Sequence, residues 1–389
     1  MSLRALLVGP SGHGGEGVYM ASLREHPPVG VRYAVAGGFH EGAPGARCQV
    51  VSELALNQIV HRLAVPDMGF RALRLRERFD LVHVHAHPVR LSGLGATPMV
   101  MSEGSSAAVY LADYLGWDDR RLARGLRRSR RIYRLLGVAD RLVALERASV
   151  AYVFSQWARD VNLRWGADPA KLRVVAPGFP DPGPLDRAGR DGAFTFLFVG
   201  GDFERKGGFE VLEAIDELRR EQPQVRLVLA GSDPAERNPD RLVHSWVSAE
   251  RRARVMEMLA GLQRDGVVRR ITWADRRTLD REYSRADAFV MPTHAEGFGF
   301  TNVEAMSFGL PVITSTAGPA GEIVADGETG VLVCAGDPGA VRDAMARLAG
   351  DPAAARRMGA AGRARFLARF TLDRSRSDLR AIYDEALGA

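Results

Sequence analysis

Short apolar segments alternate with helical stretches along this chain of 389 residues. Such alternation is typical of parallel sheets whose crossover helices cover both faces. In the N-terminal half, we predict strands at Leu3 to Val8, Val31 to Ala36, Leu81 to His85, Met99 to Ser102, Ala151 to Phe154 and Arg173 to Ala176. In the C-terminal half, a strand begins at Phe194, and others follow at Val225 to Ala230, Ile271 to Trp273, Ala288 to Met291, Val312 to Thr314 and Val331 to Cys334. The pattern predicts an α/β fold with doubly wound parallel sheets.

A segment rich in Pro, Gly, Asp and Arg separates the two sets of strands, from Pro180 to Ala193. Such composition favours a linker, which we place at residues 181–193. We therefore expect one Rossmann-like domain in residues 1–180 and another in residues 194–372. A hydrophobic content of 46% is ample for two sizeable cores.

The composition limits the setting and the partners of the chain. Its two cysteines, Cys48 and Cys334, lie in different halves and offer neither a disulfide framework nor a metal-ligand cluster. No apolar run approaches the length of a membrane span, and the N-terminus has no signal-peptide pattern. A net charge of +6 is mild for this length and does not imply nucleic acid. We expect a cytoplasmic protein.

The most informative segment for chemistry contains Glu296 and Glu304, in a stretch that runs from a glycine turn into a helix. Glu296 lies in a loop bounded by glycine, where the backbone can approach a ligand closely. A helix that starts near Thr301 directs free amides toward an anionic group such as phosphate. The two carboxylates, which accept hydrogen bonds from hydroxyls, therefore flank an anion site. This combination suits a sugar attached to a nucleotide diphosphate.

The whole stretch Glu-Gly-Phe-Gly-Phe-Thr-Asn-Val-Glu-Ala-Met resembles the donor-binding segment of the family 4 retaining glycosyltransferases. Further similarity comes from Leu197 to Gly201, from Phe203 to Gly208, and from Asp326 to Gly330. The resemblance implies the GT-B architecture, in which two Rossmann-like domains face each other across a cleft. It also implies that the last helix, at about residues 373–389, packs back on the first domain.

The resemblance implies that the chain transfers a sugar from a nucleotide diphosphate sugar to a hydroxyl acceptor, with retention of configuration. Glu304 would bind the ribose hydroxyls, and Glu296 would bind hydroxyls of the transferred sugar. The implied donor-binding residues are Gly14, Gly15, Gly201, Glu296, Gly297, Phe298, Gly299, Phe300, Thr301, Asn302, Val303 and Glu304. The expected catalytic residues are Arg205, Lys206, Glu296 and Glu103.

Lysine usage supports a special role for Lys206, because only two of the 53 lysines and arginines are lysines. A compact ammonium differs from a planar guanidinium in reach and geometry, as a phosphate-facing site can require. The common family form has an arginine where Gly201 stands, so we expect Arg205 to share the diphosphate role with Lys206. No Asp-x-Asp signature occurs among the matched motifs. We therefore expect no cofactor and no obligatory metal.

The glycine loop after the first strand has two interpretations. Gly12, Gly14 and Gly17 spell the Gly-x-Gly-x-x-Gly fingerprint of dinucleotide-binding folds. That fingerprint also requires an acidic residue at the end of the second strand, where this chain has Ala34-Val-Ala-Gly-Gly38. The family instead has a Gly-Gly loop here, against which the acceptor and the donor phosphate meet. Gly14 and Gly15 match this loop.

Histidines gather near the ends of the first domain's strands, and we select His13, His85 and His87 as acceptor-side candidates. A buried, hydrogen-bonded histidine is the alternative for each. Many family members also have a histidine after the next strand, where this chain has Glu103. The substitution indicates either an altered donor sugar or a carboxylate that acts on the acceptor hydroxyl.

Eight arginines occur between Arg120 and Arg134, interleaved with apolar residues, and predict a basic amphipathic helix. Such a helix can lie on an anionic membrane, which for a cytoplasmic protein is the inner face of the membrane. A solvated surface and an acidic acceptor explain the same charge. The sequence leaves all three open. It also leaves two other functions open, a nucleotide-sugar-binding protein of altered catalysis and, less favoured, an NAD-dependent oxidoreductase.

Overall fold

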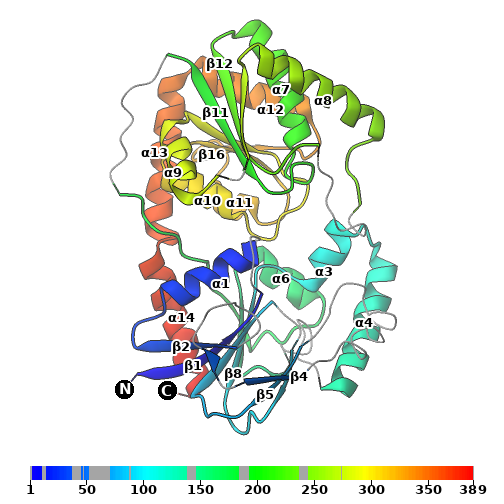
Figure 1. The fold of residues 1–389 in the computed structure, drawn as a ribbon, viewed down its shortest axis with the longest axis vertical. Coiled ribbons are helices and arrows are strands. Elements are labelled where there is room, and N and C mark those ends of the chain that lie inside the picture. The colour runs from blue at the N-terminus through cyan, green and yellow to red at the C-terminus, as the bar shows by residue number, and fades with distance from the viewer. Residues whose placement is uncertain are drawn as a thin grey trace. The chain divides into compact units, whose positions relative to one another are not determined.

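The computed structural model describes residues 2–10, 15–36, 45–46, 48–51, 71–86, 89–137, 146–183, 192–235, 244–272 and 274–388. Two compact units are present (Figure 1). The N-terminal unit comprises Met1–Gly178 and Leu372–Ala389, and the C-terminal unit comprises Phe179–Thr371. Each unit is described separately below.

A seven-stranded sheet forms the centre of the N-terminal unit, in the order β10-β9-β8-β6-β1-β2-β3. All of its pairings are parallel. The strands are β1 (Leu3–Val8), β2 (Val31–Ala36), β3 (Gly45–Ala46), β6 (Leu81–His85), β8 (Met99–Glu103), β9 (Val150–Val153) and β10 (Leu172–Val174). The helices are α1 (Gly15–Glu25), α3 (Ala107–Val109), α4 (Asp119–Leu136), α6 (Gln156–Arg164) and α14 (Leu372–Leu387), with a π-helical turn at Tyr110–Tyr114. β6 and β8 are buried along their whole length, as parallel strands covered on both faces are.

A second, three-stranded sheet in the N-terminal unit was not predicted. It contains β4 (Cys48–Val51), β5 (Arg71–Leu75) and β7 (Val89–Ser92), with β5 antiparallel to β4 and parallel to β7. Its buried side chains Leu73, Leu75 and Val89 join the core of the large sheet. The alternation in Arg-Ala-Leu-Arg-Leu75 is the strand signal that could have identified β5.

The C-terminal unit is a six-stranded parallel sheet in the order β13-β12-β11-β14-β15-β16. Numbered from the first strand of the unit, this is the 3-2-1-4-5-6 order of a Rossmann sheet. The strands are β11 (Phe194–Gly200), β12 (Val225–Gly231), β13 (Val268–Thr272), β14 (Ala288–Met291), β15 (Val312–Ser315) and β16 (Gly330–Val333). The helices are α7 (Gly208–Glu221), α8 (Ala249–Arg264), α9 (Arg276–Arg285), α10 (Phe300–Ser307), α11 (Ala320–Ile323), α12 (Pro338–Gly350) and α13 (Pro352–Arg369). The predicted α/β class with two Rossmann-like parallel sheets is confirmed.

Short polar side chains begin many of the helices. At α4, α6, α8, α9 and α12, an aspartate or serine directly before the helix accepts a hydrogen bond from a first-turn amide. Such a cap satisfies an amide that the helix cannot pair itself. The caps set where each helix starts, and with it the path of the preceding loop.

The strand order reverses between β1 and β6 in the N-terminal sheet, and between β11 and β14 in the C-terminal sheet. In open α/β sheets, ligands bind beside the carboxyl ends of the strands at such a reversal. The loops that follow these four strands are therefore the places in which to look for a site.

Helix α14 is fastened to the N-terminal sheet by a buried hydroxyl. Tyr383 is fully buried, and its hydroxyl lies 2.7 Å from Nδ1 of His83 on β6 and 2.5 Å from the hydroxyl of Tyr33 on β2. Arg376 and Arg380 also donate to backbone carbonyls just before β2. The last helix is thus part of the hydrogen bonding of the first sheet.

We predict that Tyr383→Phe destabilises the protein by about 1–3 kcal/mol, because Nδ1 of His83 and the hydroxyl of Tyr33 each lose their hydrogen-bond partner. Tyr33→Phe removes only the outer hydroxyl and should cost less. The measurement is urea unfolding of both variants and of the double variant, which should cost less than the sum of the two single changes. An unchanged midpoint for Tyr383→Phe would show that this hydroxyl does not fasten α14.

Candidate active site

Lys206 and Glu296 form an ion pair at the reversal of the C-terminal sheet. Lys206 lies in the turn between β11 and α7, and Glu296 lies in the loop between β14 and α10. Nζ of Lys206 donates to Oε2 of Glu296. The side chains are only 13% and 12% exposed, so solvent screens this pair far less than a surface pair. The structure brings these two predicted residues together.

Burial and opposite charge act against each other in this pair. Burial raises the pKa of Glu296, but Lys206 and Arg205 outweigh it, and the pKa of this carboxyl lies below its ordinary value. Burial lowers the pKa of Lys206 below its ordinary value, and Glu296 opposes this shift only in part. A buried carboxylate of this kind needs a cation beside it.

Arg205 joins the two loops and adds a second cation. Its Nη1 donates to the carbonyl of Ala295 at 2.7 Å and lies 3.8 Å from Oε2 of Glu296. The carbonyl of Arg205 accepts from the amide of His294 and from the hydroxyl of Thr293. Asp202 accepts from both the amide and Nε of Arg205. Positive charge beside Glu296 is therefore held in place by the backbone of both loops.

Two glycines in these loops adopt backbone angles that other residues rarely do. Gly207 has φ of 78°, and a β-carbon there would lie 2.3 Å from the carbonyl oxygen of Pro292. Gly299, with φ of 101°, is the N-terminal cap of α10. By contrast, Gly201 is exposed, and no atom of the described residues lies within 4 Å of a β-carbon built on it. The β-carbon of the arginine that the family commonly has there would therefore meet no described neighbour, so Gly201 leaves open space in this turn.

The start of α10 differs slightly from the prediction. The helix begins at Phe300 rather than near Thr301, and the amides of Asn302 and Val303 already donate to the carbonyl of Gly299. Two of the four predicted phosphate-facing amides are thus engaged in the first turn. Phe300 and Thr301 begin the helix and remain the candidates for an anion contact.

Aromatic rings anchor the loop between Glu296 and α10. Phe298 is buried, and its ring lies edge-on to Phe300 at 5.7 Å and to Phe370 at 6.4 Å. Phe300 also meets Phe179 edge-on at 5.4 Å. The amide of Gly297 lies 3.1 Å from Oε1 of Glu296. The rings hold the glycine-rich loop, so that its carboxylate is positioned in advance.

Glu304, one turn into α10, is held from two sides. Its Oε2 accepts from the hydroxyl of the fully buried Tyr283 at 3.2 Å. Its Oε1 accepts from Nη1 of Arg276, the first residue of α9, at 2.5 Å. Glu304 is 18% exposed, whereas Arg276 is 49% exposed. Neither partner was predicted as a site residue.

Of the predicted acceptor-side residues, the structure describes His85, which lies at the other reversal, in the N-terminal unit. Gly15 begins α1, whereas Gly14, His13 and His87 lie outside the described residues. His85, the last residue of β6, is fully buried between Tyr19 and Phe154, and its Nε2 lies 2.5 Å from Oε2 of Glu16. Ala86 follows in a strained conformation with φ of 42°. A carboxylate that was not predicted thus stands beside the predicted histidine, directly after the Gly-Gly pair.

A buried hydrogen-bonded chain extends from His85 toward α14. Ser102 Oγ lies 2.7 Å from Nδ1 of His85 and 2.8 Å from Nε2 of His83. A carboxylate only accepts hydrogen bonds, so Nε2 of His85 bears the proton given to Glu16. Ser102 Oγ thus bridges the two imidazole rings. Burial, helped by His85, lowers the pKa of His83 well below its ordinary value, which keeps this ring neutral.

Glu103 ends β8, between the sheet and α3. The residue is 2% exposed, and both carboxylate oxygens are buried within the N-terminal unit. Its contact with a substrate therefore stays a prediction, and burial of both oxygens favours a role inside this unit.

Residues 187–365 match the family described as glycosyl transferases group 1. The D-inositol 3-phosphate glycosyltransferase 2 of Catenulispora acidiphila is 30% identical over 354 residues, which cover 84% of this chain and 73% of that protein. The glycogen synthase of Mycobacterium tuberculosis is 28% identical over 303 residues, 75% of this chain and 66% of its own length. The chain thus spans from just under two thirds to about three quarters of these two relatives.

The solved structure of Anabaena HepE in complex with UDP and glucose has the same fold. It superposes with a TM-score of 0.64 at 16% identity and covers 97% of this chain and 98% of that protein. Taken together with the relatives, the ion pair at the sheet reversal and the matched motifs lead to one assignment. The chain belongs to the glycosyl transferases group 1 family.

Proposed function

We propose that this protein transfers a sugar from a nucleotide diphosphate sugar to a hydroxyl acceptor with retention of configuration. The observation that supports this most is the shielded Lys206–Glu296 pair beside the first turn of α10. It combines a cation for the diphosphate with a carboxylate for sugar hydroxyls. UDP-glucose is the first donor to test, because HepE has been solved with UDP and glucose.

The chemical work in this proposal is electrostatic. Charge grows on the diphosphate as it leaves, and groups fixed in advance near that position stabilise the transition state. Lys206, Arg205 and the amides of Phe300 and Thr301 supply the positive charge and the dipoles. Glu296 binds hydroxyls of the transferred sugar, and Glu304 binds those of the ribose. The two cations replace a metal in this scheme, so the proposal includes no obligatory metal and no cofactor.

A binding protein of the same fold that performs no transfer is the second candidate. Open space at Gly201 and the buried carboxylate of Glu103, where the family commonly has an arginine and a histidine, favour it. Nucleotide-sugar binding without release of the nucleotide diphosphate would support this candidate.

The arginines of α4 form a face that we propose contacts an anionic membrane. The apolar side of the helix is already buried in the N-terminal unit, with Leu122, Leu126 and Tyr133 at 2%, 6% and 0% exposure. The helix therefore cannot insert an apolar side into lipid, as a surface-lying amphipathic helix does. Contact with lipid would therefore be mainly electrostatic.

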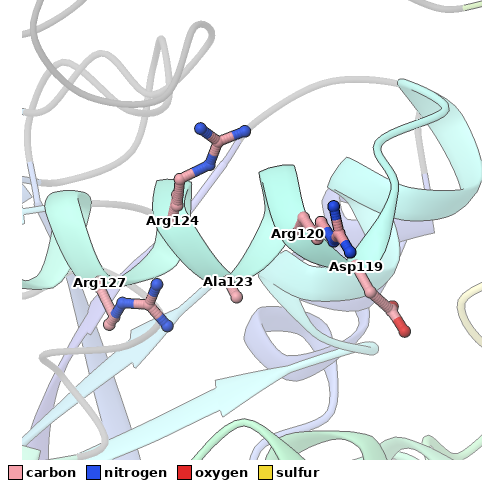
Figure 2. A pocket seen from close by; sticks show the side chains of 5 residues that line it. All are labelled: Asp119, Arg120, Ala123, Arg124 and Arg127. Atoms are coloured by element: carbon pink, nitrogen blue, oxygen red, sulfur yellow. The ribbon is translucent and has the colours of Figure 1, made fainter.

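Five exposed arginines line the opposite side of α4 at helical spacing, and we call them the arginine stripe: Arg120, Arg124, Arg127, Arg128 and Arg131. Figure 2 shows Arg120, Arg124 and Arg127 on successive turns around a shallow hollow. None of the five forms an ion pair with any residue that the structure describes, whereas Arg130 and Arg134 pair with Glu146. Leu135 ends the same side at 87% exposure.

An exposed leucine beside arginines that pair with none of the described residues suits a lipid surface better than a soluble anion. Each basic residue near an anionic surface adds about 1 kcal/mol, and Leu135 can enter the headgroup layer. Within the described residues, no helix is long and apolar enough to cross a membrane. The association that we propose is peripheral, at the inner membrane face.

We predict that Lys206→Ala lowers release of UDP from UDP-glucose by about 100-fold or more, the loss expected when a fixed transition-state contact is removed. Arg205→Ala should lower it less, since Lys206 remains. Lys171→Ala, at the only other lysine, is the matched control and should behave like the parent. Unfolding is measured in parallel, because Glu296 loses its main cation. Release by a folded Lys206→Ala protein at the rate of the parent would remove Lys206 from the site.

We predict that the protein sediments with anionic but not neutral vesicles at low salt, and that salt reverses this by screening. Changing Arg124, Arg127, Arg128 and Arg131 to Gln should abolish the binding and leave nucleotide binding intact. The control variant changes four exposed arginines of the C-terminal unit to Gln, namely Arg264, Arg347, Arg356 and Arg357. Equal loss in both variants would indicate net charge alone. No sedimentation of the parent would refute membrane contact.

A further inference from the structure

Arg276 contacts Glu304, the carboxylate that we propose binds the ribose. Its Nη1 donates to Oε1 of Glu304 at 2.5 Å, while Nε and Nη2 both donate to Oδ1 of Asp280, at 2.8 Å and 2.5 Å. Asp280 lies four residues further along α9, on the same side of the helix. The guanidinium is therefore fixed on its own helix before it reaches Glu304. A preset arginine of this kind loses little freedom when it makes a further contact.

Glu304 has one partner on the side of the core and one on the side of the solvent. Tyr283, fully buried, stacks on Phe308 with ring centroids 5.2 Å apart and supports Oε2 from within the core. Arg276 contacts Oε1 from the solvent side. A carboxylate offers about four acceptor positions, of which the residues that the structure describes use two. Two positions remain for the neighbouring hydroxyls of a ribose.

Charge balance decides whether Arg276 stays when a nucleotide binds. Ribose hydroxyls are neutral donors, and a nucleotide that covers Glu304 also removes the water that solvates it. A carboxylate without water and without a cation is costly, typically by several kcal/mol. A nucleotide that displaced Arg276 would leave the carboxylate of Glu304 without water and without a cation. The pair with Glu304 is therefore more valuable in the bound state than in the free state.

We infer that Arg276 is a positioning residue for nucleotide recognition, which keeps Glu304 charged and oriented for the ribose hydroxyls and stays in place when the nucleotide binds. The inference rests on the proposed function, because it assigns the ribose to Glu304. Electrostatics agree with the geometry. Burial lowers the pKa of Arg276, yet Glu304 and Asp280 outweigh it and hold this pKa above its ordinary value. The arginine thus remains charged whenever Glu304 is ionised.

The test compares each ribonucleoside diphosphate with its 2′-deoxy counterpart, using UDP, ADP and GDP, by isothermal titration calorimetry. We expect the parent to bind at least one ribonucleotide more tightly than its deoxy form. In Arg276→Gln, the affinity for that ribonucleotide should fall about ten-fold, while the affinity for the deoxy form changes little. The ribose preference should therefore shrink. A residue that only stabilised α9 would weaken both nucleotides equally.

Two further variants sharpen the result. Arg277→Gln removes the same charge from the next residue of α9, which is also exposed, and should keep the ribose preference of the parent. Arg276→Lys keeps the charge without the fork that Asp280 holds, and should keep part of the preference. Equal or tighter ribonucleotide binding by Arg276→Gln would overturn the inference, and tighter binding would make Arg276 a competitor of the ribose.

Glu304→Gln separates failure of this inference from failure of the proposed function. If it loses the ribose preference while Arg276→Gln retains it, Glu304 binds ribose and Arg276 plays no part. If Glu304→Gln keeps the preference, or the parent binds none of the nucleotides, the proposed role of Glu304 is wrong and the inference falls with it.

Discussion

The contact between Lys206 and Glu296 is the interaction on which the rest of the site depends. It exists because β11 and β14 are neighbours in the sheet although 87 residues separate their last and first residues, Gly200 and Ala288, in the chain. Both strands end on the same edge of the sheet, and each is followed by a loop with a glycine at a backbone angle that other residues rarely adopt. With a different strand order, Lys206 and Glu296 would lie on loops that do not meet. The burial of both side chains turns that proximity into a strong electrostatic feature.

The N-terminal unit has a comparable arrangement with different chemistry. There Glu16 follows β1 and His85 ends β6, again at the two strands beside the reversal. The histidine is neither free nor exposed, because Ser102 occupies its other nitrogen. In both units, a group at the reversal is thus preset by buried partners. In the N-terminal unit, those partners extend to Tyr383 on the last helix.

Sequence patterns were sufficient where a single segment determines the structure. β1, β2, β6 and β14 lie at the predicted residues, because each is an apolar run between turn residues. β13 begins at Val268 and not at Ile271, since Arg269 and Arg270 interrupt the apolar run although β12 pairs with them. The motif around Glu296 identified the loops of the site, and the structure adds a contact between Glu296 and Lys206 that was not predicted. Helix α10 begins one residue before the predicted start, because Gly299 is its N-terminal cap.

Contacts between distant segments were beyond the reach of these patterns. Arg276 is one arginine among many, and nothing near it in the sequence indicates that it meets Glu304, 28 residues further on. Glu16 and His85 are 69 residues apart, although the position of Glu16 after Gly14 and Gly15 was a usable signal. The small sheet required pairing between segments of mixed polarity. Such features depend on which strands become neighbours, which only the fold determines.

The most direct test of the central claim is a thermal-shift series with UDP-glucose, UDP, UMP and NAD. A ligand that binds the folded state stabilises it by mass action, by about 2.7 kcal/mol at 100 times its Kd. The account predicts a rise in Tm with UDP-glucose and UDP, a smaller rise with UMP, which lacks the second phosphate for Lys206 and Arg205, and none with NAD. Stabilisation by NAD alone, or equal effects of UMP and UDP, would contradict it.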